Sequence, residues 1–284
     1  MNQNLFEKSK GVTLIELLIA MLISAILIAG IYRTFIHQQK TYATQEQVAD
    51  MQQNVRVAIN RMMREIRMAG FGSIQGVLPV TFLGGTRNYT NVVNPDAPVA
   101  GALTIVSAIG GAAALLKQPG DSVGAMVLAS NQIQVSALAE FDTNNKRYIS
   151  IGGLESNSIT AIDGANNILT LNTDVGNFYN TNGSTLVYAI RAISYRIMID
   201  ATGSPILRRD ENTGGGFQPM ADNIETIEFR NPDGSTPLNP NSMSMQVTVT
   251  AITDRPDPEL LQGGGDGYRR RQFTSIILQR NRGL

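Results

Sequence analysis

The pattern of hydrophobic and polar positions changes twice along the chain. Residues 12–31 form an apolar run in which Glu16 is the single charged side chain, and no proline occurs between residues 12 and 69. After the run, apolar residues recur three or four positions apart, which is the spacing of one helix face. We therefore predict one helix over residues 12–69, whose second half lays an apolar stripe on a globular domain or, alternatively, forms a coiled-coil dimer. The stripe consists of Val48, Met51, Val55, Ile59, Met62, Ile66 and Ala69.

Residues 70–284 have the pattern of a β domain, in which short apolar runs are separated by segments rich in Asn, Asp, Gly and Pro. Segments 85–101 and 110–123 are predicted to be long loops. Ile224, Ile227 and Phe229 share no single face, so their strand is expected to begin late. These features predict an α+β fold, with a long N-terminal α-helix packed on a C-terminal antiparallel β-rich domain. The expected strands are residues 77–83, 103–109, 124–130, 132–138, 148–152, 158–162, 167–172, 184–199, 224–230, 243–252 and 271–278.

Glu16 is the first candidate functional residue. A helix of the length of residues 12–31 spans about 30 Å, the thickness of a bilayer core, and a carboxylate inside such a span costs about 2.5–3.5 kcal/mol. The leader, residues 1–11, carries Lys8 and Lys10, so the positive-inside rule places the rest of the chain outside the cytoplasm. The run fits a plain membrane anchor or a helix exposed by cleavage in front of it better than a secretory signal, because no small-residue cleavage site follows it. A cut after Gly11 would free an amino group that can pair with Glu16 of another subunit.

The segment from residue 10 to residue 17, Lys-Gly-Val-Thr-Leu-Ile-Glu-Leu, resembles the type III signal of type IV prepilins. The resemblance implies the pilin fold, cleavage after Gly11 by prepilin peptidase, methylation of the new N-terminus at Val12, and an assembly role for Glu16. The family usually has phenylalanine where Val12 stands. The neighbouring motif residues that the resemblance assigns to assembly are Thr13, Leu14 and Ile15.

Segments 39–72 and 268–284, and more weakly 194–211 and 220–234, resemble PilW-type minor pilins. This resemblance implies a subunit that primes or caps a type IV pilus, with other minor and major pilins and the inner-membrane assembly platform as partners. It further implies a single-pass inner-membrane protein with a periplasmic domain that later joins the cell-surface fimbrium used in adhesion and twitching motility. The J-type pseudopilins of type II secretion are the nearest alternative. A tip adhesin or DNA-uptake module that uses a long insert at about 73–183 is the other.

The implied domains are the leader 1–11, the transmembrane or fibre-core helix 12–31, its amphipathic continuation 32–69 and the β domain 70–284. Balanced charge, with 23 basic and 23 acidic residues, gives no indication of a nucleic-acid partner.

The composition points away from catalysis. There is no cysteine, and His37 is the single histidine, so neither a catalytic triad nor a zinc site is expected. We expect no enzyme activity, no cofactor and no metal. Asp142 and Asp163 fit turn capping better than calcium binding. The arginines at 269–271 fit the solvated start of a strand, and the glycine-rich segment 263–267 fits a flexible connection.

Overall fold

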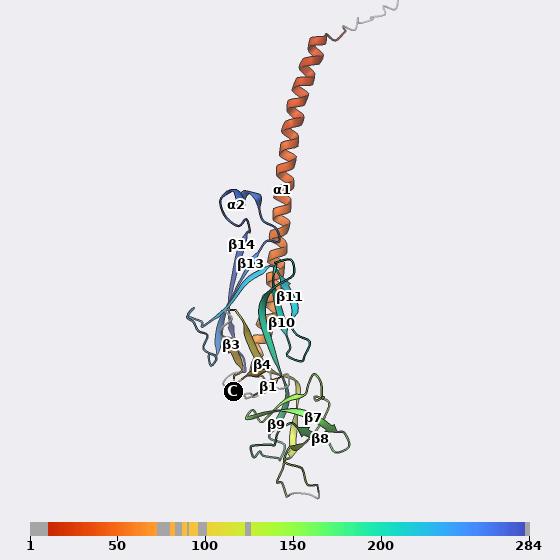
Figure 1. The fold of residues 1–284 in the computed structure, drawn as a ribbon, viewed down its shortest axis with the longest axis vertical. Helices are drawn as coiled ribbons and strands as arrows, with labels where there is room; N and C mark the ends of the chain where they lie inside the picture. Colours follow the sequence, from red (N-terminus) through yellow and green to blue (C-terminus); the bar gives the residue numbers. More distant parts are fainter. Residues whose placement is uncertain are drawn as a thin grey trace, which may run out of the picture. The chain divides into compact units, whose positions relative to one another are not determined.

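The computed structural model describes residues 11–72, 80–82, 87–89, 91–95, 101–122 and 126–281. The chain divides into two compact units, one up to Ala49 and one from Asp50 onward. Helix α1 (Leu14–Arg67) begins in the first unit and ends in the second (Figure 1). The expected helix at 12–69 is therefore confirmed, although it is shorter by two residues at each end. Leu14 and Arg67 mark these ends because Thr13 caps the first turn and tighter turns begin at Met68.

In the second unit, α1 buries one apolar stripe. The helical spacing of the prediction is correct, but Val48 and Ile59 are only half-buried, and Ala58 lies on the buried side instead of Ile59. Ala58 follows Val55 by three positions and precedes Met62 by four, which keeps the buried face aligned with the 3.6-residue period. The residues buried on this face are Met51, Val55, Ala58, Met62 and Ile66, with Ala69 in the following turn.

The end of α1 is tied to the sheet by backbone hydrogen bonds. Gly70, the residue after the predicted helix 12–69, has a φ of 77°, and its amide donates to the Val106 carbonyl at 3.0 Å. The Ala108 amide donates to the Phe71 carbonyl at 2.8 Å. Gly72 has a φ of 101°, and a Cβ there would lie 2.8 Å from Cβ of Ala108, so glycine is required. The helix thus ends against strand β4 (Leu103–Lys117).

Strands β4 (Leu103–Lys117) and β9 (Leu186–Ile199) form the centre of the second unit. They pair antiparallel from Leu103↔Tyr195 to Ala114↔Leu186. The first half of β4 pairs with β3 (Val93–Pro95), and the last half of β9 pairs with β10 (Pro205–Asp210), which in turn pairs with β11 (Gln218–Asp222). These strands form an antiparallel sheet. Strand β9 lies at the expected strand 184–199, and its hairpin with β10 falls in segment 194–211.

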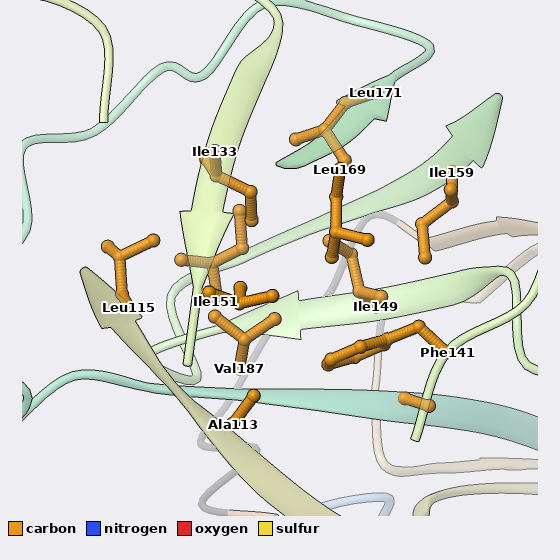
Figure 2. Close-up of a cluster of buried hydrophobic side chains, with 12 residues drawn as sticks. Ala113, Leu115, Ile133, Phe141, Ile149, Ile151, Ile159, Leu169, Leu171 and Val187 are labelled. Carbon is orange, nitrogen blue, oxygen red and sulfur yellow. The ribbon is translucent and has the colours of Figure 1, made fainter. Parts of the chain in front are cut away.

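The other halves of β4 and β9 belong to a closed antiparallel barrel. Its other strands are β5 (Gln132–Val135), β6 (Tyr148–Ile151), β7 (Glu155–Asp163) and β8 (Ile168–Leu171). Around the ring, the paired strands are β4–β9, β9–β6, β6–β7, β7–β8, β8–β5 and β5–β4. Side chains such as Ile133, Phe141, Leu169 and Val187 point towards one another inside this ring (Figure 2). Because such a barrel fills its interior with its own side chains, it has a core of its own.

The predicted loop at 110–123 is wrong, because β4 continues through it to Lys117. The register against β9 shifts between Ile109 and Ala112, which is a bulge at Gly110 and Gly111. Bulges bend a strand and increase its twist, so this one turns β4 from the sheet into the barrel.

Two further expectations need correction, and a third is described only in part. The expected strand at 124–130 is absent in its described part, residues 126–130. The expected loop at 85–101 contains β2 (Arg87–Tyr89) and β3 in its described part, and β2 pairs with β1 (Val80–Phe82). The expected strand at 77–83 is described only as β1; its other residues lie outside the described residues, as do residues 85, 86, 90 and 96–100 of the expected loop.

A third antiparallel sheet contains β12 (Ile224–Arg230), β13 (Ser244–Ile252) and β14 (Arg270–Leu278), with the short helix α2 (Pro258–Gln262) between the last two. The expectation of a late start for β12 is wrong. A register shift between Ile224 and Thr226 brings Ile224, Ile227 and Phe229 to one buried face. The Ser275 hydroxyl lies 3.4 Å from the Met63 sulfur of α1, so this sheet also covers the helix. The predicted α+β fold class is confirmed.

Candidate processing and assembly site

The predicted cleavage position lies in an exposed, non-helical segment. Gly11, Val12 and Thr13 precede α1 and are exposed, and no atom of the described residues lies within 4 Å of a Cβ built on Gly11. The leader residues Lys8 and Lys10 lie outside the described residues. The backbone at the predicted cleavage position is therefore accessible from solvent in the described part of the chain.

Thr13 and Glu16 form a reciprocal capping box at the start of α1. The Thr13 hydroxyl accepts from the Glu16 amide at 3.3 Å, while the Thr13 amide and hydroxyl both donate to Oε2 of Glu16 at 2.9 Å. The Leu17 amide then donates to the Thr13 carbonyl at 3.2 Å, which closes the first helical turn. Capping of this kind satisfies amides that the helix leaves without a partner. The carboxylate also lies where the helix dipole favours negative charge.

The capping box changes the interpretation of Glu16. From the sequence, this carboxylate was expected to find its partner only when subunits assemble, whereas in the structure Oε2 accepts from the amide and the hydroxyl of Thr13. Oε1 has no hydrogen bond to the described residues, so it can accept from a group outside the chain. The local signal was readable, because Thr-x-x-Glu in front of an apolar run is the sequence pattern of a capping box. Both residues follow Gly11, so cleavage there leaves the box intact.

The apolar side chains beside the capping box are exposed. Leu14 is 80% and Ile15 65% exposed, and exposure continues through the run to Ile31 at 68%. Among the described residues, α1 is the one helix with a stretch long and apolar enough to cross a membrane, and none of that stretch is buried. A continuous apolar surface of this kind requires lipid or other helices around it.

The barrel presents a second candidate surface. Because its strands alternate in direction, the loops 118–131, 152–154 and 172–185 lie at the same end of the barrel, although residues 123–125 are outside the described part. These loops expose Val127 (91%), Leu154 (67%) and Phe178 (89%). Glu155 holds two of the loops together by accepting from the amides of Gly176 and Asn177 and from the hydroxyl of Tyr179.

The other polar residues singled out from the sequence have structural partners. Asp142 accepts from the amides of Asn144 and Lys146, and Asp163 accepts from Asn166 and Ala165. The Asn166 side chain, followed by the Ala165 amide, holds the pKa of Asp163 below its usual value. These contacts confirm turn capping. No group of three or more potential metal ligands occurs in the described part of the chain.

The arginines at 269–271 lie at the solvated start of β14, as predicted, and each has a partner. Arg269 pairs with Asp257, and Arg270 pairs with Glu225 and Asp266. The guanidinium of Arg271 lies over the Phe273 ring, 5.5 Å from its centroid. Through Asp266, which binds Arg270, the glycine-rich segment 263–267 has a side-chain contact with β14.

Comparison with known proteins identifies the N-terminal segment. Residues 7–32 match the prokaryotic N-terminal methylation motif. No curated protein and no solved structure matches the chain. The motif makes the chain similar to type IV pilins and pseudopilins, which are processed by prepilin peptidase and are generally structural subunits rather than enzymes. Together with the exposed apolar helix, it indicates membrane anchoring before assembly.

Proposed function

We propose that this chain is a minor pilin that primes or caps a type IV pilus through contacts between subunits. The supporting observation is the methylation motif at residues 7–32, placed on a helix whose first turn is already closed by Thr13 and Glu16. In this proposal, prepilin peptidase removes the leader 1–11, and Val12 becomes the methylated N-terminus. The mature chain then has three parts, a membrane or fibre-core helix at 12–31, its amphipathic continuation at 32–69 and the β domain at 70–284.

Glu16 has two tasks in this mechanism. Oε2 caps the helix of its own chain, while Oε1 remains available for the terminal ammonium of a neighbouring subunit. An ion pair in a low-dielectric helix bundle offsets much of the cost of burying either charge. The pairing therefore favours transfer of the helix from lipid into a fibre and sets its axial position. Leu14 and Ile15 supply the adjacent apolar contacts. Partners are the other minor and major pilins and the inner-membrane assembly platform.

The test compares Glu16→Gln with Glu46→Gln, a matched change of an exposed acid farther along α1. Glutamine keeps the size of the side chain but removes its charge. We expect Glu16→Gln to reduce the number of fibres per cell and the co-purification of other pilins. Glu46→Gln should leave both unchanged. Mass spectrometry of the exported chain should show an N-terminus at Val12 in both variants. Normal fibre numbers in Glu16→Gln, or an exported chain that still begins at Met1, would overturn the proposal.

The barrel end supports a second candidate function, an adhesive tip. Three large apolar side chains, Val127, Leu154 and Phe178, are exposed on loops that meet at one end of a rigid barrel. Binding residues are commonly presented on loops held by a rigid scaffold. Replacing all three by serine should abolish adhesion and spare fibre formation if this end is the receptor site. Unchanged adhesion would exclude it.

A further inference from the structure

A charged groove lies in the second unit between the last turns of α1 and the strands β4, β9 and β10. Its volume is about 700 Å³, which is large enough for several side chains rather than a single ion. Apolar side chains from α1 and β9 line part of it, and charged side chains line the rest. The groove is lined by Val57, Asn60, Arg61, Arg64, Glu65, Met68, Ser107, Arg191, Ile193, Arg209 and Glu211.

Arg209 lines the groove, and all three of its guanidinium nitrogens are paired with carboxylates. Its side chain is 8% exposed, its Nη2 lies 3.0 Å from Oε1 of Glu65, and its Nη1 lies 2.6 Å from Oε1 of Glu211. Glu65 is also approached by Nε of Arg61 at 3.6 Å. The two carboxylates of the groove are therefore already engaged by two of its four guanidinium groups.

The remaining two arginines, Arg64 and Arg191, have guanidinium donors that make no hydrogen bond within the described residues. Nε of Arg191 is buried without a hydrogen-bond partner, and its Nη1 lies 3.9 Å from Glu211, beyond hydrogen-bond distance. Arg64 is exposed and has no ion pair with any described residue. With four arginines against two glutamates, the lining has an excess of two positive charges. Burial raises the pKa of Glu211, but the hydrogen bond and charge of Arg209, with the charges of Arg191 and Arg61, lower it below its usual value.

We propose that this groove binds an acidic polypeptide segment that presents two carboxylates, one to Arg64 and one to Arg191. Planar guanidinium groups match carboxylates in geometry, and two carboxylates balance the excess charge of the lining. Val57, Met68 and Ile193 provide apolar contacts that a peptide uses and a free ion does not. If the chain is a pilin, as proposed above, the segment comes from a neighbouring subunit. The binding chemistry itself does not depend on that assignment.

The test measures binding directly with full-length protein in an uncharged detergent. The probes are a fluorescently labelled glutamate-rich hexapeptide and its glutamine counterpart, followed by fluorescence anisotropy. The variants are Arg64→Gln, Arg191→Gln and the double change. Arg56→Gln is the matched control, because Arg56 is an exposed arginine on the same helix that does not line the groove. Thermal melting of each variant checks that the fold is retained.

We expect saturable binding of the glutamate peptide, weakened roughly tenfold by each single change because a charge-assisted hydrogen bond is lost. The double change should weaken it further, and Arg56→Gln should leave it unchanged. Equal affinity of the double variant and wild type, or equal binding of both peptides, would overturn the proposal. Displacement of the peptide by inorganic phosphate at equal concentration would show a free-anion site and overturn the polypeptide assignment. None of these results depends on fibre numbers, so the pilin proposal and this one can fail separately.

Discussion

Replacing Glu65 by glutamine should destabilise the second unit by removing the main partner of a nearly buried arginine. Glu65 is 13% and Arg209 8% exposed, and Nε of Arg209 lies 3.2 and 3.1 Å from the two Glu65 oxygens. Removing one partner of a buried ion pair costs about 3–5 kcal/mol when the other is left without compensation. Here Glu211 still binds Nη1, so the expected loss is nearer the value of charged hydrogen bonds, about 2–3 kcal/mol. For a domain of this size, that lowers the melting temperature by about 4–10 °C.

The assay is thermal unfolding of full-length protein followed by circular dichroism, with Glu46→Gln as the control for an exposed acid. The combined change Glu65→Gln with Arg209→Met should recover part of the loss, because methionine leaves no buried charge without a partner. Glu211 can then be hydrated, since 45% of its side chain is exposed. A Glu65→Gln variant that melts within about 1 °C of wild type would refute the argument, as would a double variant less stable than the single one.

Three further predictions follow from local contacts. Thr13→Ala removes the capping hydroxyl and should speed hydrogen exchange of the first-turn amides of α1, at a cost of about 1 kcal/mol, measured by mass spectrometry. Leu169→Ala opens a cavity in the barrel core and should cost about 2–5 kcal/mol in denaturant unfolding, whereas Val127→Ser, on an exposed loop, should change stability by less than about 0.5 kcal/mol. The Arg270 side chain, followed by the Tyr268 amide, lowers the pKa of Asp266 from 3.8 to about 2. This depressed pKa means that its stabilising contribution is complete above pH 3.8 and is lost as the pH falls towards 2; Asp266→Asn should remove that part of the pH dependence of melting.

Elements with a strong local pattern could be predicted from the sequence. The distal part of α1 and the strand β9 were identifiable because helical spacing and β-rich apolar runs are local signals. Segment 110–117 was missed because two glycines and a run of alanines carry no alternation, and β9 and β5 hold it as a strand. Residues 126–130 show the opposite case. Their composition favours a strand, yet Met126 binds Lys117 through its carbonyl and Val127 points into solvent.

The same distinction holds for the functional surfaces. Glu16 was evident because a carboxylate in an apolar run is exceptional, and its contact with Thr13 was readable from their spacing. The groove was not predictable, because Arg64 and Arg191 are far apart in sequence. They line the same groove only because α1 packs against the sheet that contains β9. No local pattern distinguishes Arg191 from the other arginines of the strands.

The chain enters the barrel through β4 and leaves it through β9, which are paired with each other, so the barrel can be removed as a module. Ala112 and Tyr188 are directly opposed partners at its base, so a two-residue hairpin turn can connect them and omit everything between. Tyr188 should be retained because its ring lies edge-on to Phe71, with 6.1 Å between the ring centroids. A deletion of residues 73–183 would instead remove β4 from the centre of the helix-bearing sheet. To exchange the binding specificity of the barrel, replacing the chain between Ala112 and Tyr188 is therefore preferable to replacing residues 73–183, because β4 is retained.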